Sequence, residues 1–490
     1  MEKILVNGRR FVDSFGRERI FFGMNVTDKA PFGDGKTEHC HASCDWVGKF
    51  SEYGFNIVRL GFTWSAVEPE IGKYNTTLLD SVKNIVKECE KKGIYVFLDI
   101  HQDLYSDVID KAGDGAPSWA VFTDGKKIVQ HRFVWADRYF FGSACHKAFD
   151  NFWNNRSVEG KGLIDHFASM WQFISEYFDD CPNVFGFDML NEPFPGTPGG
   201  KIFKKLIVNL ARTTLFDSRI KKTKLISSLF KENAIVEILD QYTGDIFLKI
   251  TDAGSKILSK FDKEKYSPFL NKVSSSIRSV TDNGILFIEG DYYSNIGMLS
   301  GTDPITVNGK RDANQCYSPH GYDFFVDTDL YKYASDSRVG AIFAQHKKTQ
   351  DRLSVPVLVG EWGGSSKGTE WLSHLEFLLD TFDSYRWSST YWTFTPDRPE
   401  QELVLDVLKR PRPVAVTGNI IDYRYDKEAD IFTVNFAQDK EYDAPTEIYC
   451  HKPIKEVTTC GEWEYEALSE STGKLIVRTK PGKHRITVKF

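Results

Sequence analysis

The sequence predicts an α/β fold, a (β/α)₈ barrel followed by a small antiparallel β-sandwich. Short apolar runs rich in β-branched residues alternate with amphipathic helical segments, which indicates a parallel sheet. Several runs end in polar residues of catalytic type, and a closed barrel gathers all strand ends on one face. A doubly wound sheet has no such ring, and it favours a Gly-rich phosphate turn after the first strand. Here that place holds FGMNVTDKAPFGDG, without G-x-G-x-x-G.

Length and composition agree with a large folded enzyme. The 490 residues exceed the roughly 250 of a minimal barrel. Hydrophobic residues make up 41% and aromatic residues 14%, which excludes a disordered chain. Basic residues number 62 and acidic residues 68, giving a net charge of −6. This balance gives no reason to expect nucleic-acid binding.

The barrel strands are predicted from seven apolar runs. A representative helix between them is 78–91, where Leu78, Leu79, Val82, Ile85 and Val86 recur at helical spacing. The predicted strands are 20–26, 56–62, 94–100, 184–190, 285–289, 355–360 and 390–394.

Two stretches do not fit a minimal barrel. Residues 197–282 form a mainly helical insertion, far longer than an ordinary βα connection. After the breaker KRPRP, short alternating runs at 431–436, 446–450, 475–479 and 485–490 predict the β-sandwich. We therefore expect a catalytic barrel over 1–407, including the insertion, and a C-terminal domain over 408–490.

The strand ends carry two glutamates suited to glycoside hydrolysis. Hydrolysis with retention needs two carboxyl groups about 5 Å apart, one protonated and one ionised. Glu192 lies between Asn191 and a proline, and Glu361 closes a nearly all-apolar strand. A charge in such a place is costly unless it is paired or functional. Either glutamate alone would be explained by an ordinary salt bridge, but the pair, with the other polar strand ends, favours catalysis.

These motifs resemble the retaining (β/α)₈ enzymes of glycoside hydrolase family 5. The resemblance covers the barrel and implies that Glu192 is the acid/base and Glu361 the nucleophile. It further implies that Arg59 and Tyr322 orient Glu361, that His101, Asn191 and His320 bind sugar hydroxyls or tune the carboxylates, and that Trp392 faces the sugar. The matching segments are NIVRLGFTW (Arg59), DIHQD (His101), LNEP (Asn191, Glu192), SPHGYD (His320, Tyr322), VGEWG (Glu361) and TYWTF (Trp392).

Within that family, VTDKAPF, DIHQDLYS and FDMLNEPF resemble endoglycoceramidases and their glucosylceramidase-type relatives. This implies that Lys29 and Asp103 grip the glucose nearest the lipid, although an ordinary surface lysine would also explain Lys29. The implied reaction cleaves the bond between the glycan and ceramide of glycosphingolipids, without a metal or cofactor. The alternatives are an exo-acting β-glucosidase on glucosylceramide or steryl glucoside, and a non-catalytic carbohydrate- or lipid-binding barrel. The long insertion departs from the resemblance.

The insertion is strongly basic. Between Lys201 and Lys231 it carries nine basic residues and a single acidic one, Asp217, with apolar residues at helical spacing. Such a segment predicts contact with a membrane or micelle surface, or alternatively a helix pair on the barrel with a solvated lysine face. We expect a monomer whose partners are a glycolipid substrate and such a surface.

The cysteines and the start of the chain indicate little about the fold or the function. Cys450 and Cys460 would pair across a hairpin or remain reduced, and His39, Cys40, His41 and Cys44 lack a second ligand pair at zinc-finger spacing. The chain begins MEKILVNGRRF, without the apolar core of a signal peptide, and has no apolar run of about 20 residues. We expect a soluble protein, either cytoplasmic or secreted with its leader removed.

Overall fold

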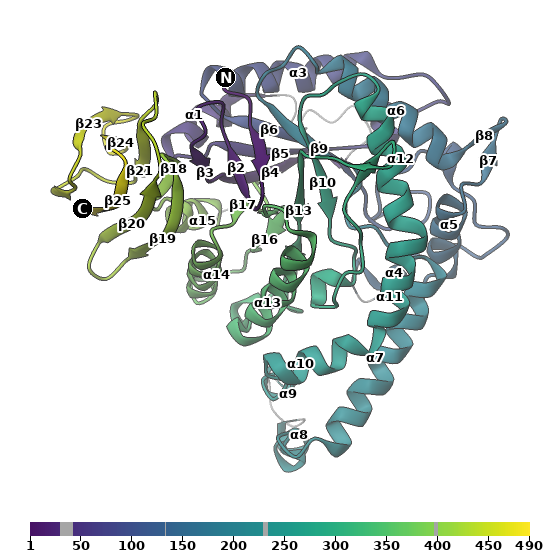
Figure 1. Cartoon of the computed structure of the whole chain (residues 1–490). Coiled ribbons are helices and arrows are strands. Elements are labelled where there is room, and N and C mark those ends of the chain that lie inside the picture. The colour runs from purple at the N-terminus through teal and green to yellow at the C-terminus, as the bar shows by residue number, and fades with distance from the viewer. Residues whose placement is uncertain (30–42, 133, 229–233, 396–399) are drawn as a thin grey trace.

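The computed structural model describes residues 1–29, 43–132, 134–228, 234–395 and 400–490 (Figure 1). Its centre is an eight-stranded parallel sheet. A parallel bridge between Tyr317 and Val357 joins the first and last strands and closes the sheet, which confirms the predicted barrel. Around the sheet the strands are β13 (Gln315–Ser318), β10 (Ile285–Glu289), β9 (Val184–Asp188), β6 (Tyr95–His101), β5 (Ile57–Thr63), β4 (Phe22–Thr27), β17 (Ser388–Tyr391) and β15 (Leu358–Val359).

The strand β13 has no counterpart among the seven predicted runs. Its sequence, QCYS, lacks an apolar run, yet all its residues are buried. Gln315 is tolerated there because its side-chain amide bonds the backbone N–H and carbonyl of Ile305. A buried strand whose polar groups are satisfied by side chains leaves no hydrophobic signature.

Helices surround the barrel. In α3 (Thr76–Lys91), the predicted apolar stripe is buried against the sheet, and the Asn75 side chain caps the helix by accepting the Leu78 N–H. The other helices of the ring and its connections are α1 (Asp45–Glu52), α2 (Trp64–Val67), α4 (Asp137–Phe141), α5 (Ser143–Trp153), α6 (Leu163–Tyr177), α13 (Asp336–Leu353), α14 (Leu372–Tyr385) and α15 (Gln401–Leu408).

The predicted helical insertion contains both projecting and barrel-packed helices. The helix α10 packs against both α7 and α13, and Figure 1 shows α8, α9 and the far end of α7 extending away from the barrel. By contrast, α12 packs against α6 and leads into β10, so it belongs to the barrel ring. The helices in order are α7 (Thr197–Phe216), α8 (Lys222–Ser228), α9 (Ala234–Leu239), α10 (Gly244–Thr251), η3 (Asp252–Gly254), α11 (Ser255–Phe261), η4 (Asp262–Tyr266) and α12 (Ser267–Arg278).

The C-terminal strands form the predicted antiparallel sandwich, but one of its sheets continues into the N-terminus. That seven-stranded sheet runs β1-β2-β3-β18-β21-β24-β23, and the opposing one runs β19-β20-β25-β22. This pairing was not predicted, because the N-terminal strands are only two or three residues long. The strands are β1 (Leu5–Asn7), β2 (Arg10–Val12), β3 (Glu18–Arg19), β18 (Arg412–Val416), β19 (Asn419–Asp426), β20 (Ile431–Gln438), β21 (Thr446–Cys450), β22 (Glu456–Thr458), β23 (Glu462–Ala467), β24 (Gly473–Arg478) and β25 (Gly482–Lys489).

Cys450 and Cys460 are both free thiols in the structure, the first buried and the second exposed. Of the His39, Cys40, His41 and Cys44 group, only Cys44 lies within the described residues. Within those residues, no helix is long and apolar enough to cross a membrane.

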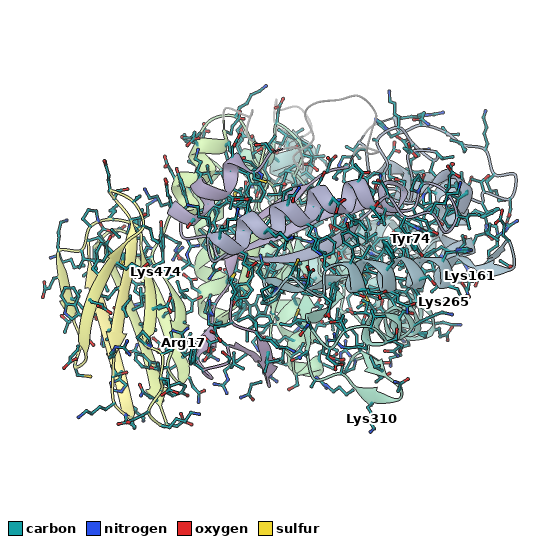
Figure 2. All side chains as sticks on the ribbon, turned by 90° about the horizontal axis from the view of Figure 1, so that it is seen from above. Arg17, Tyr74, Lys161, Lys265, Lys310 and Lys474 are labelled. Carbon is teal, nitrogen blue, oxygen red and sulfur yellow. The ribbon has the colours of Figure 1, made fainter. Side chains whose placement is uncertain are left out.

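A buried ion-pair group joins the N-terminal strands to the sandwich. Arg17 lies where the C-terminal strands meet the barrel (Figure 2). Its Nε donates to Asp13 Oδ2 at 2.9 Å, and its Nη1 donates to Glu447 Oε1 at 2.8 Å and to the Pro445 carbonyl at 2.7 Å. The side chain of Asp13 is fully buried and that of Arg17 is 6% exposed. Removing Arg17 would leave Asp13 with Arg19 at 3.4 Å and Glu447 with Lys474 at 3.6 Å, which are longer pairs than those that Arg17 makes.

We expect Arg17→Ala to lower the free energy of unfolding by about 3 kcal/mol, because Asp13 and Glu447 lose their main cation. Thermal unfolding followed by circular dichroism measures the change. The matched control is Arg9→Ala, since the Arg9–Asp351 pair is 45% and 48% exposed. The control should lose less than about 1 kcal/mol. Equal losses in the two variants would contradict a stabilising role for the buried group.

Candidate active site

The residues predicted for the site come together at the carboxyl ends of the barrel strands. They surround or underlie a cavity of about 1260 Å³, with Arg59 and His320 beneath its floor. Lys29 follows β4, Arg59 lies within β5, His101 ends β6 and Asp103 follows it. Asn191 and Glu192 follow β9, His320 lies in β14 (His320–Gly321), Tyr322 follows it, Glu361 lies in β16 (Glu361–Trp362), and Trp392 follows β17.

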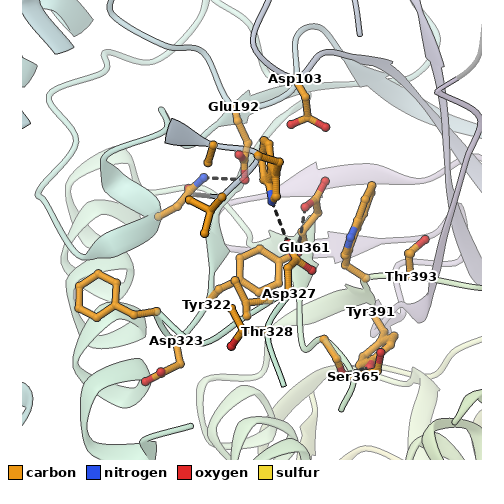
Figure 3. Close-up of a pocket in the computed structure, with 18 of the residues that line it drawn as sticks. Asp103, Glu192, Tyr322, Asp323, Asp327, Thr328, Glu361, Ser365, Tyr391 and Thr393 are labelled. Atoms are coloured by element: carbon orange, nitrogen blue, oxygen red, sulfur yellow. Dashed lines mark hydrogen bonds between the residues drawn. The ribbon is translucent and has the colours of Figure 1, made fainter. Parts of the chain in front are cut away.

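The two glutamates face each other across one pocket (Figure 3). A carboxylate oxygen of Glu192, one of Glu361 and a ring nitrogen of His320 all lie within 4.8 Å of one another. Both glutamates are buried, at 8% and 4% exposure. This spacing matches the roughly 5 Å between carboxyl groups at which one acts as nucleophile and leaves no room for water between them.

Glu361 is held by two strong donors. Arg59 Nη1 donates to its Oε1 at 2.6 Å, and the Tyr322 hydroxyl donates to its Oε2 at 2.9 Å. The parallel pairing of β14 with β16 sets His320 opposite Glu361. A guanidinium and a phenol directed at one carboxylate stabilise its charged form and fix its orientation.

The groups hydrogen-bonded to the Glu192 carboxyl are neutral instead. Its Oε1 accepts a bond from Asn295 Nδ2 at 2.9 Å and lies 3.0 Å from His320 Nδ1. Burial lowers the pKa of His320 to about 3, so this imidazole is uncharged. Burial and the nearby Asp103 carboxylate raise the pKa of Glu192 to about 7. One carboxyl is therefore poised to give a proton and the other to attack.

The backbone at Glu192 is tightly fixed. Its φ is +44°, in the left-handed region that non-glycine residues rarely adopt. Gln102 Nε2 donates to the carbonyls of Asn191 and Glu192 at 2.8 and 3.1 Å. The Glu192 N–H donates to Glu289 Oε1 at 2.6 Å. These bonds stabilise the turn that directs Glu192 into the pocket.

A second charged group lies beside the carboxylates. Lys29 Nζ donates to Asp103 Oδ2 and stands 4.9 Å from the centre of the Trp392 ring. Burial raises the pKa of Asp103, but Lys29 and His101 outweigh burial and lower it to about 2. Burial lowers the pKa of His101, yet Asp99 and Asp103 raise it to about 10. His101 also stacks on Trp392, with centroids 5.2 Å apart and planes at 9°. An ammonium, a carboxylate and an aromatic face together suit a sugar.

The cavity lining changes from polar to apolar toward the insertion. Its polar part is formed by the strand ends, whereas its far wall is built from the apolar sides of α7 and of the segment around α10. That wall includes Phe203, Leu206, Ile207, Leu210, Tyr242, Phe247 and Ile250.

The sequence analysis missed several site residues. Asn295 lies in the short helix η5 (Ser294–Ile296) after β10, and no motif marks it. Glu289 ends β10 and was signalled by the same strand-end logic as Glu361. Asp114 bonds the Asp103 N–H at 3.0 Å from a loop without periodicity, so only the fold reveals it.

Three acidic or histidine clusters in the described residues are close enough to hold a metal ion. In two of them a protein cation already balances the charge, Lys29 beside Asp103 and Arg59 beside Asp188. The third contains Glu192, His320 and Glu361.

Comparison with known proteins gives concordant matches. The family model described as "Cellulase (glycosyl hydrolase family 5)" matches residues 12–398, and "Glycoside hydrolase family 5 C-terminal domain" matches 410–489. An endoglycoceramidase of Cyanea nozakii is 33% identical over 214 residues, which cover 38% of this chain and 41% of that one. The chain thus spans about two fifths of the length of that curated relative. Endo-glycoceramidase II from Rhodococcus sp., solved as a lactosyl-enzyme intermediate, superposes with a TM-score of 0.74 at 25% identity, covering 98% of both chains.

We expect Glu192→Gln to make the protein more stable above neutral pH. Between the ordinary pKa of 4.5 and about 7, folded Glu192 holds a proton that the unfolded chain releases, so its contribution to stability falls as pH rises. Glutamine does not titrate, so its advantage should grow from zero below pH 4.5 to about 3 kcal/mol above pH 7. Calorimetric Tm values across this pH range measure it.

Glu176→Gln on α6 is the matched control for the substitution itself, because this side chain is exposed. A constant Tm difference between Glu192→Gln and the parent at all pH values would contradict the raised pKa.

Proposed function

Because the chain belongs to glycoside hydrolase family 5, we propose that it hydrolyses a β-glycosidic bond with retention, using Glu192 and Glu361. The observation that carries the proposal is the pair of buried carboxyls with oxygens within 4.8 Å and opposite surroundings. Glu361 has a guanidinium and a phenol as donors, whereas Glu192 has an amide and a neutral imidazole.

The reaction proceeds in two steps. Glu361 attacks the anomeric carbon, the bond to the leaving oxygen breaks, and Glu192 gives its proton to that oxygen. In the second step Glu192, now ionised, takes a proton from water, and the resulting nucleophile attacks the anomeric carbon and releases Glu361. A Glu192 pKa of about 7 suits a group that must act as acid and then as base.

The proposed substrate is a glycosphingolipid, cleaved between the glycan and ceramide. The relatives' printed names support this class, since they include endoglycoceramidases and a Rhodococcus enzyme in complex with ganglioside GM3. The cavity supports it independently, because its polar end offers Lys29, Asp103 and Trp392 to a sugar and its insertion wall offers apolar side chains to a lipid.

An exo-acting β-glucosidase is the second candidate, and glucosylceramidases are among the relatives. The cavity favours endo cleavage, because its lining includes, besides Trp392, the polar side chains of Asp28, Asp45, Lys49 and Thr395. Polar side chains there can hold sugars beyond the first. A non-catalytic barrel is disfavoured by the paired carboxyls.

We expect the protein to release intact lactose from lactosylceramide, identified by mass spectrometry of the released sugar. Glu361→Gln should lower this activity by at least about 10⁴-fold, because the nucleophile is lost. Glucose released from glucosylceramide, with lactosylceramide left uncut, would support the exo candidate instead. Binding of glycolipid with no hydrolysis would leave only the non-catalytic barrel.

We further propose that the insertion contacts a membrane or micelle surface. One flank of α7 lines the cavity, while other side chains near its end and on α8 face outward. Val208, Leu215, Phe216 and Ile226 are 67%, 58%, 80% and 61% exposed. Exposed lysines accompany them, namely Lys204, Lys205, Lys221, Lys222 and Lys224. Exposed apolar side chains among cations suit an anionic lipid interface next to the cavity.

We expect the double variant Leu215→Ser/Phe216→Ser to lose about tenfold in activity on lactosylceramide in phosphatidylserine vesicles, because less apolar surface enters the interface. Its activity on a soluble aryl lactoside should stay within about twofold, since neither residue lines the cavity. Ile421→Ser on β19 is the control, because Ile421 is 48% exposed and lies on the sandwich. Equal losses on both substrates would contradict the interfacial role.

A further inference from the structure

Glu289 is a buried carboxyl to which the reaction described above gives no role. It ends β10 and is 1% exposed. Its Oε1 accepts the Glu192 N–H at 2.6 Å and lies 3.5 Å from His320 Nε2. Its Oε2 lies 3.6 Å from Arg59 Nη2. Glu289 therefore touches the backbone of the proposed acid/base from below the pocket.

The carboxyls around Glu289 outnumber the cations. Oxygens of Asp99, Asp188 and Glu289 all lie within 4.8 Å of one another. The single guanidinium of Arg59 also pairs with Glu361. Carboxylates in contact within a buried site cannot all be ionised, because their repulsion is barely screened there. The titratable side chains facing Glu289 are Arg59 on β5, Asp99 on β6, Asp188 on β9, His320 on β14 and Tyr266 on η4.

Three oxygens in this group accept no hydrogen bond from an N–H or hydroxyl group of the described residues: Asp99 Oδ1, Asp188 Oδ1 and Glu289 Oε2. Asp99 Oδ1 still lies 3.0 Å from Arg59 Nη2, which leaves Asp188 and Glu289 as the uncompensated pair. A buried acceptor left unsatisfied costs about 1–3 kcal/mol. Oxygens of Asp188 and Glu289 lie within 4.8 Å of each other. A proton on one of these carboxyls lets it donate to the other and satisfies both Asp188 Oδ1 and Glu289 Oε2.

We propose that Glu289 is a positioning residue that stays protonated in the working enzyme, donating through Oε2 to Asp188 while Oε1 holds the Glu192 N–H. The inference rests on the proposed function, because it acts through the proton donor Glu192. The proton lies on Glu289 rather than Asp188 because Arg59 Nε already donates to Asp188 Oδ2 at 3.0 Å. Burial and the charge of Asp188 raise the pKa of Glu289 well above its ordinary value, in agreement with this geometry.

Glu289 helps to set the orientation of the Glu192 carboxyl. Its left-handed backbone is strained for a side-chain-bearing residue and persists only while its surroundings enforce it. Gln102 fixes the carbonyls of that turn, and Glu289 fixes its N–H. Without Glu289 the N–H is buried and unpaired, and the carboxyl shifts relative to the leaving oxygen. A misplacement of about 1 Å can cost about 100-fold in rate.

The test compares Glu289→Gln with Glu289→Leu on two substrates. Glutamine keeps one acceptor and one donor without charge, so its kcat/KM should stay within about threefold of the parent on lactosylceramide. Leucine should lose about 100-fold on lactosylceramide, whose alkoxide leaving group needs the proton. On 2,4-dinitrophenyl β-lactoside, whose phenolate leaves unaided, leucine should lose less than about tenfold. A smaller fraction of folded protein alone would lower the activity on both substrates by the same factor.

Two outcomes would overturn the inference. A Glu289→Gln variant as impaired as Glu289→Leu would show that a negative charge is required at this position. Equal losses by the leucine variant on both substrates, with its Tm unchanged, would show that Glu289 does not act through Glu192.

Infrared spectroscopy tests the protonation of Glu289 directly, even if the Glu289→Leu variant does not fold. At a pH well above the Glu192 pKa of about 7, the parent minus Glu289→Gln spectrum should show the carbonyl stretch of a protonated carboxylic acid. Its absence would overturn the proposal. If the parent cleaves neither substrate, the proposed function fails, while the infrared spectrum still reports whether Glu289 is protonated.

Discussion

The site depends on one buried cation, the guanidinium of Arg59. Its side chain is fully buried in the middle of β5 and bonds Asn25 on β4, Asp188 on β9, Asn191 after β9 and Glu361 on β16. A buried charge of this kind is tolerated only when its partners surround it with good geometry. The same requirement therefore fixes the relative positions of strands on opposite sides of the barrel, and with them the nucleophile candidate Glu361.

The different states of the two glutamates follow from the limited supply of positive charge. Arg59 compensates the carboxylates it touches, and Lys29 and His101 compensate Asp103. Among the described residues, the hydrogen-bond partners of the Glu192 carboxyl are Asn295 and the uncharged His320. Because the nearby charges are already committed, its carboxyl holds a proton to a pKa of about 7. Electrostatics thus distinguishes two residues of the same type, in keeping with the proposed roles of Glu192 as acid and Glu361 as nucleophile.

The sequence predicted the barrel and the strand-end residues because buried parallel strands leave apolar runs and because the family motifs are short and local. The apolar pattern missed β13, where the polar groups of the buried Gln315 side chain are hydrogen-bonded. It also missed the N-terminal strands, which are too short to form a pattern. Asn295 and Glu289 were missed for another reason. Their contacts with Glu192, about 100 residues away, are not encoded in local spacing, although Glu289 stands at a strand end as Glu361 does.

The insertion follows directly in the chain after the turn that carries Glu192. Only Pro193 to Gly196 separate Glu192 from α7, and Gly196 has a φ of +72°, with no room for a Cβ beside Asp150. Asp150 accepts bonds from the N–H and hydroxyl of Thr197, which fixes the start of the helix. The apolar wall on α7 is thereby held in register with the proton donor. The polar strand ends and the apolar insertion thus line one cavity, which suits the proposed substrate, a sugar joined to a lipid.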